Sequence, residues 1–272
     1  MKRLIIFSLL FATCALAYAG NAEKTITEER SVPEFHKIEI KGSVDVVYSQ
    51  ESSVNIKVKG KQDEVAKVIT HVDDGVLIVD YKNGGSWFST TGDLVVYAAS
   101  PSLDEVKING SGDFEAENKI EGESFEIGIY GSGDCECELD VQNLKLKSHG
   151  SGDVEFEGVK NSLDMTLNGS GDVEAEELDL INGNVSQYGS GDVTLEGYCR
   201  ELQLKQSGSG DCQARDLTVK NVNIRKSGSG DAVLTVKNSI EVKSSGSGDT
   251  HCYGNPSSVK ESVSGSGELY IK

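Results

Sequence analysis

The sequence predicts an all-β protein built as a single-stranded, right-handed parallel β-helix. Three observations predict this fold. A Gly-Ser-Gly-Asp motif recurs at steps of 18–21 residues, apolar and polar residues alternate on both sides of each motif, and no repeat shows a ten-residue helical period. One coil per motif gives about nine regular coils, preceded by an irregular, β-rich N-terminal capping region.

The motif itself is the strongest signal in the chain. A ninth copy, which starts at Gly265, ends in Glu268 in place of Asp. The eight complete copies begin at Gly110, Gly131, Gly150, Gly169, Gly189, Gly208, Gly228 and Gly246. Glycine supplies positive φ, and an Asp side chain accepts hydrogen bonds from backbone N–H groups, so each motif is expected to form a tight corner.

Strands are expected on both sides of each corner. The first and third residues after the Asp are mostly apolar, as in Val154 and Phe156, whereas the residue between them is mostly polar. An apolar residue also stands four positions before each first Gly, and only Glu261 breaks that column. Identical columns at this period stack as parallel coils about 4.8 Å apart. Right-handed crossover is the strong default for parallel strands.

Two other repeat folds do not fit this spacing. Propeller blades need about 40 residues each, which is twice the length of this repeat. Calcium-binding nonapeptide rolls carry two Gly-rich turns in every coil, whereas this chain has one motif per coil.

The N-terminal part is expected to consist of a targeting segment followed by a cap. Residues 1–19 are expected to be a signal peptide, because a basic start and an apolar run lead to the cleavage pattern Ala17-Tyr18-Ala19. Lipid attachment at Cys14 is the rival interpretation, although its context is a poor lipobox. Residues 20–105 are expected to form irregular β coils and the cap, with one helix between Lys61 and Thr70. They should share one core with the repeat β-helix of residues 106–272.

Charge and cysteine content exclude several function classes. The formal charge is −18, and removal of Lys2 and Arg3 with the signal peptide makes it −20. Such an acidic protein repels nucleic acid and anionic membranes. No mature apolar stretch approaches the roughly 18 residues of a membrane span. Of the five remaining cysteines, Cys135 and Cys212 share one inward column and Cys137 and Cys252 the other, and these four are interpreted as small apolar fillers.

A family resemblance rests on the reiterated motif. The segment Ile108-Asn109-Gly110-Ser111-Gly112-Asp113, followed by repeated Gly-Ser-Gly-Asp-Val, resembles the auto-transporter adhesin, head GIN domain, family of secreted bacterial proteins. The β-rich lead-in from Phe35 resembles it too. The resemblance implies a right-handed β-helix and a role in adhesion, without catalytic or binding residues that could be carried over.

Three outward columns are candidates for binding. Asp residues of the motif form the first, which is interpreted mainly as a corner element and alternatively as a row of weak calcium sites at Asp134, Asp153, Asp172 and Asp192. The second is a stripe of glutamates, interpreted as a solvated face or as a surface that docks onto basic or calcium-bridged partners. The third stands directly before each motif and includes Tyr130, His149, Asn168 and Tyr188. It is interpreted mainly as a row of ordinary exposed corner residues and alternatively as a sugar-binding surface.

No catalytic site and no required cofactor are predicted. No nucleophile has a recognisable base, and carboxylate pairs recur on every coil, so they single out no catalytic pair. The leading hypothesis is a non-catalytic binding or adhesion module, exported to the periplasm, cell surface or medium, whose partner is a glycan or a protein. The alternatives are a polysaccharide-processing enzyme of pectin-lyase-like shape and a structural envelope protein.

The oligomeric state is predicted from the last coil, which could pair with another chain. A terminal coil presents unpaired backbone groups to other chains. Tyr270 and Lys272 are expected to point outward, and the loop from Gly254 to Ser257 is expected to fold across the end. The sequence therefore predicts a monomer or a weak end-to-end dimer formed through this coil.

Overall fold

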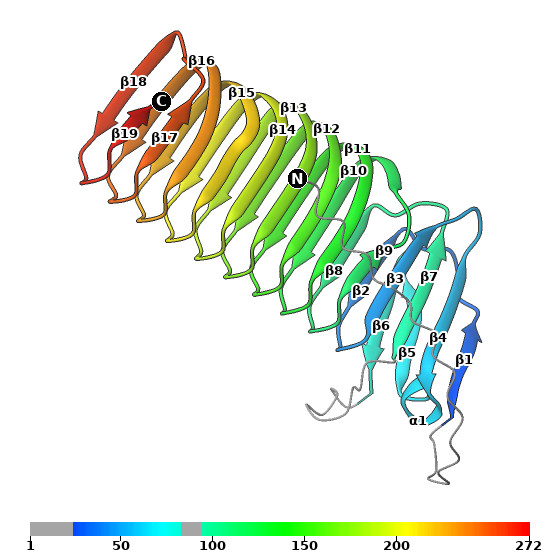
Figure 1. Cartoon of the computed structure of the whole chain (residues 1–272). Coiled ribbons are helices and arrows are strands. Elements are labelled where there is room, and N and C mark those ends of the chain that lie inside the picture. Colours follow the sequence, from blue (N-terminus) through cyan, green and yellow to red (C-terminus); the bar gives the residue numbers. More distant parts are fainter. Residues whose placement is uncertain (1–23, 83–93) are drawn as a thin grey trace, which may run out of the picture.

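The chain folds as a rod of stacked coils with a different structure at each end (Figure 1). The computed structural model describes residues 24–82 and 94–272. The expected signal peptide and Cys14 lie outside the described residues. Within them, all strands belong to one continuous sheet and helix is limited to a single turn. The expected all-β solenoid of about nine turns is confirmed.

The strands fall into two groups along the chain. The N-terminal group comprises β1 Thr25–Arg30, β2 Lys37–Ile40, β3 Asp45–Gln50, β4 Asn55–Lys61, α1 Gln62–Val65, β5 Val68–Asp73, β6 Val76–Tyr81, β7 Val95–Ser100, β8 Glu105–Ile108 and β9 Phe114–Ala116. The C-terminal group comprises β10 Ile120–Ile129, β11 Cys135–Ser148, β12 Val154–Leu167, β13 Val173–Gln187, β14 Val193–Gln206, β15 Cys212–Lys226, β16 Ala232–Ser244, β17 Thr250–Tyr253, β18 Ser258–Val263 and β19 Leu269–Ile271.

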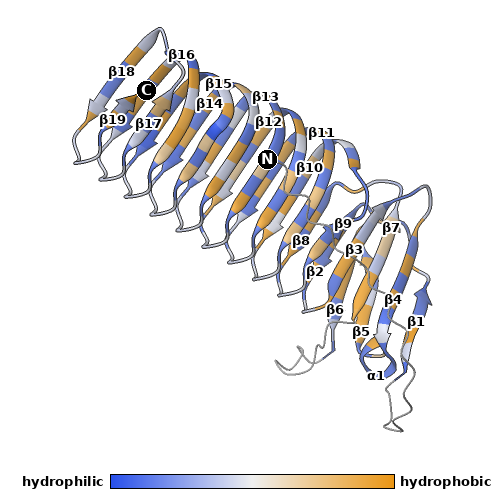
Figure 2. Ribbon diagram, in the orientation of Figure 1, coloured by the Kyte–Doolittle hydropathy of each residue, from blue (hydrophilic) through white to orange (hydrophobic). Residues whose placement is uncertain are grey.

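Each regular coil is one long strand that bends in its middle and ends at a motif. Successive coils pair in parallel and in register, so that Val154 lies beside Val173 and Met165 beside Val185. The register shifts at the bend, for example between Glu157 and Ser162. The predicted inward columns are buried from Phe114 to Cys252, apart from the partly buried Ala116, and Figure 2 shows the resulting alternation along the strands. One apolar core runs from the cap through the rod.

The motif glycines do not have the positive φ expected for a corner. Among the glycines of the described residues, positive φ occurs instead at Gly75, Gly158, Gly197 and Gly254. A Cβ on Gly169 would lie 1.8 Å from the carbonyl oxygen of Gly150, one coil earlier, and a Cβ on Gly171 would lie 2.0 Å from that of Gly152. The expectation about φ is therefore wrong. Glycine is required because the corner backbones of neighbouring coils stack too closely for any side chain.

One corner belongs to a coil outside the nine repeats. The segment Gly42-Ser43-Val44-Asp45 lies between β2 and β3 and stacks directly on the first motif. Ser111 N–H donates to the Gly42 carbonyl at 3.0 Å, and Asp113 N–H donates to the Asp45 carboxylate at 3.1 Å. Part of the segment expected to be irregular is thus a regular coil.

Antiparallel strands close the N-terminal end. Strand β4 pairs antiparallel with both β1 and β7, and β5 pairs antiparallel with β6. The helix expected from Lys61 to Thr70 is one turn, α1, and Val68 already begins β5. The apolar residues that suggested a longer helix belong to a turn and to the strand that follows it. Val65 in α1 and Val68 in β5 are both buried in the same core.

At the C-terminal end the described strands β17, β18 and β19 all pair in parallel with the preceding coils. Every residue of β18 is exposed, including Val259 and Val263. The loop before β18 does not fold across the end as expected. It stacks on the preceding coil instead, where the Ser257 hydroxyl donates to the Asn238 carbonyl at 3.0 Å. Tyr270 is 38% exposed and stacks on His251, with ring centroids 5.0 Å apart.

Candidate functional site

The column before the motifs forms an exposed ladder along one edge of the rod. Its backbone is fixed by the stack: His149 N–H donates to the Ile129 carbonyl and Asn168 N–H to the Ser148 carbonyl, both at 2.8 Å. Because each coil contributes one such position, the side chains stand one strand spacing apart, about 4.8 Å. Tyr130, His149, Asn168 and Tyr188 are all exposed, as predicted from the sequence.

Three of the four predicted ligand-binding residues contact one another. The rings of Tyr130 and His149 stack with centroids 5.5 Å apart and an interplanar angle of 8°. The Asn168 side-chain amide lies 3.1 Å from His149 Nδ1. On the other side, the Lys107 ammonium lies 5.2 Å from the Tyr130 ring centroid. This flat, partly aromatic surface can stack against a planar or apolar ligand face and also offers hydrogen bonds.

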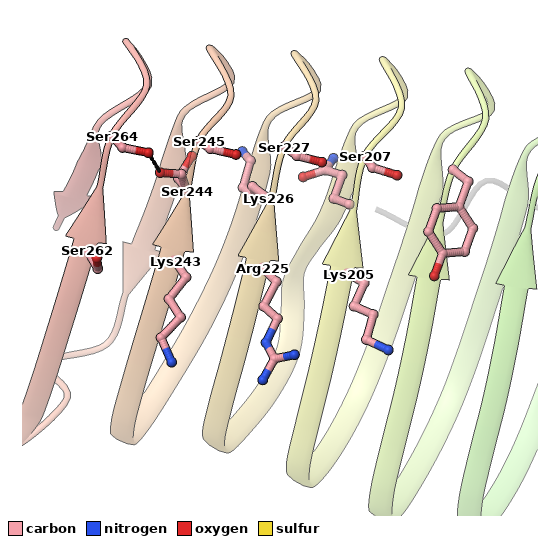
Figure 3. Close-up of a pocket in the computed structure, with 12 residues that line it drawn as sticks. Lys205, Ser207, Arg225, Lys226, Ser227, Lys243, Ser244, Ser245, Ser262 and Ser264 are labelled. Atoms are coloured by element: carbon pink, nitrogen blue, oxygen red, sulfur yellow. Dashed lines mark hydrogen bonds between the residues drawn. The ribbon is translucent and has the colours of Figure 1, made fainter.

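Tyr188, the fourth residue, lies at the border of a groove on the later coils. The groove has a volume of about 620 Å³. Figure 3 shows a row of serines beside three long cationic side chains from successive strands. The lining residues are Tyr188, Lys205, Gln206, Ser207, Arg225, Lys226, Ser227, Lys243, Ser244, Ser245, Ser262 and Ser264.

Sequence reasoning missed the basic part of this groove. Lys205, Arg225 and Lys243 each stand three residues before a motif, and the strand register places them side by side on β14, β15 and β16. A comparison of the residues three positions before each motif would have identified these cations. The columns one and four residues before the motif contain almost no cations and gave no sign of them.

A buried polar column under the corner was also missed. Gln187 donates from Nε2 to the carbonyls of Gly191 at 2.7 Å and Asp211 at 3.1 Å, and Gln206 repeats both contacts one coil later. The next coil carries Lys226, which is 3% exposed and donates to the Asp249 carbonyl. Burial lowers the pKa of Lys226, although nearby Asp231 and Asp249 oppose the shift. A cation thus occupies a place that amides fill in the two preceding coils.

The Asp column works as a hydrogen-bonded ladder. Asp153 N–H donates to the Asp134 carboxylate at 2.8 Å, Asp172 N–H to Asp153 at 2.8 Å, and Asp192 N–H to Asp172 at 2.7 Å. The predicted corner role of these carboxylates is therefore observed. One oxygen of each of the four candidate calcium ligands, Asp134, Asp153, Asp172 and Asp192, already accepts a backbone N–H. In the described ranges no group of three or more potential metal ligands is gathered.

The acidic stripe lines a shallow hollow on the early coils. Glu136, Glu155 and Glu174 lie side by side in register on β11, β12 and β13. Burial, reinforced by the neighbouring glutamates, raises the pKa of Glu155 and that of Glu157. These carboxylates repel one another at neutral pH. Since the arrangement repeats from coil to coil, no two of them stand out as an acid and a nucleophile.

The cysteines of the described residues are free and buried. Burial raises the pKa of Cys199 to about 11 and that of Cys212 to about 12. The Cys137 thiol and burial raise the pKa of Cys135. Because the thiolate is the reactive form, these side chains pack as apolar groups, as the sequence suggested.

Among the residues that the structure covers, no helix is long and apolar enough to span a bilayer.

Comparisons with known proteins agree with this architecture. A family model described as "Putative auto-transporter adhesin, head GIN domain" matches residues 34–195 and 182–256. A search of curated proteins gave no match.

Several solved structures share the fold. A Parabacteroides distasonis protein described as a "Putative lipid binding protein" superposes with a TM-score of 0.68 at 23% identity, over 93% of this chain and 98% of that one. A second protein of that organism, described as a "putative adhesin", gives a TM-score of 0.65 at 21% identity over 92% and 98%. A "putative adhesin" from Parabacteroides merdae gives 0.60 at 23% identity over 93% and 98%. At these identities the likeness concerns the fold alone.

Proposed function

Because the chain belongs to the auto-transporter adhesin, head GIN domain, family, we propose that it is an exported, non-catalytic binding module that acts at the cell surface. Its proposed ligand is a glycan, and its proposed binding face is the ladder of Tyr130, His149, Asn168 and Tyr188. The observation that carries this proposal is the stacking of Tyr130 on His149 together with the side-chain hydrogen bond between His149 and Asn168.

The physical reasons lie in the geometry of the ladder. Sugar rings present apolar C–H faces and a rim of hydroxyl groups. Aromatic rings pack against the former, and amide or imidazole groups hydrogen-bond to the latter. Tyr130 and Tyr188 are 45% and 46% exposed, so both rings are open to a ligand. The rigid β-stack holds these groups in place before binding, so little side-chain entropy is lost when a ligand docks.

A glycan array probed with residues 20–272, in calcium and in chelator, tests the proposal. The variant with Tyr130→Ala and His149→Ala should lose most of the bound signal while its melting temperature stays close to that of the wild type. The matched control carries Thr194→Ala and Gln213→Ala, which change two outward positions beyond the corner. Unchanged glycan binding in the Tyr130/His149 variant would contradict the assignment of the face, and a wild-type protein that binds no glycan would contradict the ligand class.

A further inference from the structure

The rod carries a concentrated positive stripe although its formal charge is −18. Lys205 pairs in register with Arg225, and Arg225 pairs in register with Lys243. All three are exposed on the same side of successive strands (Figure 3). Parallel strands are about 4.8 Å apart, so these cations repeat at that distance along the rod axis.

The protein neutralises this stripe only in part. Lys243 pairs with Glu241 at 2.7 Å, and Arg225 also contributes, without a close contact, to lowering the pKa of the Glu241 carboxyl. Within the described residues Lys205 and Arg225 form no close ion pair and no side-chain hydrogen bond. The earlier coils behave differently, since Lys145 and Lys147 both contact Glu126 at 2.8 and 3.7 Å. Like charges placed side by side without partners repel. A ligand of opposite charge would remove that repulsion.

The groove beside the stripe has no carboxylate among its lining residues. Its floor includes the buried Lys226, which fills a position where Gln187 and Gln206 make the equivalent corner hydrogen bonds. An ammonium in that place costs desolvation energy that an amide avoids. A residue that departs from the repeat at a cost in desolvation is expected at a functional site. Lys226 adds positive potential to the groove from below.

Hydroxyl groups complete the lining. Ser207, Ser227 and Ser245 lie one per coil along the groove, and they also border a second hollow above the glycine corners. Serine hydroxyls donate and accept, so they can bond to alcohols as well as to anions. Charge and hydroxyl groups both repeat at the coil spacing, and a periodic surface is matched best by a periodic ligand.

We propose that this groove binds a linear anionic polysaccharide that lies along the rod axis. Its carboxylate or sulfate groups pair with Lys205, Arg225 and Lys243, and its hydroxyl groups bond to the serine row. This inference rests on the proposed glycan-binding function, because Tyr188 joins the groove to the ladder, and it adds the charge of the ligand. A thin chain fits better than an anionic membrane, because a broad surface would also meet the repulsion of the acidic body.

The test compares four probes at low and high salt: polygalacturonate, heparin, neutral dextran and phosphatidylglycerol vesicles. The groove variant carries Lys205→Ser, Arg225→Ser and Lys243→Ser, since the chain itself places Ser186 and Ser262 in this column. We expect the wild type to bind at least one acidic polymer and not dextran, and the groove variant to bind it at least about tenfold more weakly. Added salt should weaken wild-type binding. Polygalacturonate and heparin distinguish carboxylate from sulfate recognition.

Two control variants separate charge from fold. Lys160→Ser, Lys220→Ser and Lys237→Ser remove the same number of charges from exposed positions outside the groove and should leave binding within about twofold. Lys226→Gln keeps a donor for the corner carbonyls. It should raise the melting temperature while weakening binding of the acidic polymer several-fold. A structural role alone would not produce these opposite changes.

The outcomes distinguish this inference from the proposed function. Binding of neutral glycans only, with no loss in the groove variant, would overturn the anionic-ligand inference and leave the glycan-binding function standing. Binding to anionic vesicles without binding to any soluble acidic polymer would assign the stripe to a lipid surface and overturn the inference as well. No binding to any glycan would overturn both.

Discussion

The early and late coils of the rod have the same backbone and opposite surface chemistry. Strands β11 to β13 expose a row of glutamates after the corner, including Glu136, Glu155 and Glu174. At the same position the next coils carry Thr194, Gln213 and Val233. Before the corner the difference reverses, since cations in the early coils are paired with Glu126 and two cations in the late coils are not.

This contrast separates what the repeat fixes from what it leaves free. The glycine corner, the Asp ladder and the inward columns continue from the early coils into the late ones, because each coil must stack on the last. Outward positions contact solvent and other outward side chains, so their chemistry can change without disturbing the stack. Charge is therefore segregated along the rod, with an acidic hollow on the early coils and a basic groove on the late ones.

The largest effect is expected from substitutions in the glycine corners, which the early and late coils share. Gly169→Val in an early coil and Gly228→Val in a late one should each destabilise the protein by on the order of 4 kcal/mol or more, or prevent folding. In both, a Cβ would lie within 1.9 Å of the carbonyl of the preceding glycine corner. Thermal or urea unfolding would measure the loss. Ser170→Val and Ser229→Val, at the exposed centre of the same motifs, should cost far less, and equal losses in both pairs would refute the close-stacking explanation.

The sequence predicted the repeated part of the molecule well, because each column is sampled nine times. Burial from Phe114 to Cys252 and exposure of Tyr130 and Tyr188 followed directly from alternation. Features that occur only once in the chain were harder to predict from the sequence. The corner at Gly42-Ser43-Val44-Asp45 matches the motif in three of four residues, but it lies 68 residues before Gly110, outside the period.

The two errors in local structure have a common physical origin. Both arose because a sequence pattern was explained by the conformation of its own segment, whereas contacts with other segments determine the structure there. The motif glycines were expected to be needed for positive φ. They are needed instead because the carbonyl group of the preceding coil leaves no room for a side chain. The helix expected between Lys61 and Thr70 gave way to β5 because pairing with β6 outweighs helical spacing. The basic groove was missed for a similar reason, since it exists only once neighbouring coils are placed side by side.

A moderate effect is expected at the buried column under the corner, where early and late coils differ. Gln206→Ala should destabilise by about 2 kcal/mol, because it opens a cavity and removes donors to Gly210 and Asp231. Gln206→Leu should cost less than about 1 kcal/mol, since Leu167 fills this column in an early coil. Chemical denaturation would measure both. An equal loss in the two variants would show that the hydrogen bonds, and not the volume, stabilise the late corners.

A smaller effect is expected from the acidic hollow. Because Glu155 and Glu157 have raised pKa values in the folded protein, their charged forms destabilise it at neutral pH. Glu155→Gln with Glu157→Gln should stabilise by about 0.5 kcal/mol at pH 7. The wild type should recover this difference as pH falls, because its folded-state carboxyls take up protons before the unfolded ones near 4.5.

Extending the stripe by one coil provides the reverse test. Thr194 lies beside Glu174 in register, so Thr194→Glu should destabilise by a similar amount at pH 7 and less at pH 4. Melting temperatures recorded from pH 4 to pH 8 would follow both variants. A difference that does not depend on pH would remove charge repulsion as the cause of the contrast between the two hollows.

The smallest effect is expected at the Asp ladder, which the early and late coils share. Asp153→Asn with Asp172→Asn keeps a side-chain oxygen that can accept the N–H of the next coil, so stability should change by less than about 0.5 kcal/mol. Asp153→Ala removes that acceptor from the Asp172 N–H and should cost about 1 kcal/mol. Since one oxygen of each carboxylate is already occupied, millimolar calcium should leave the melting temperature unchanged. A rise with calcium that the double Asn variant loses would instead assign a cation to this ladder, because a ligand that binds only the folded state stabilises it by mass action.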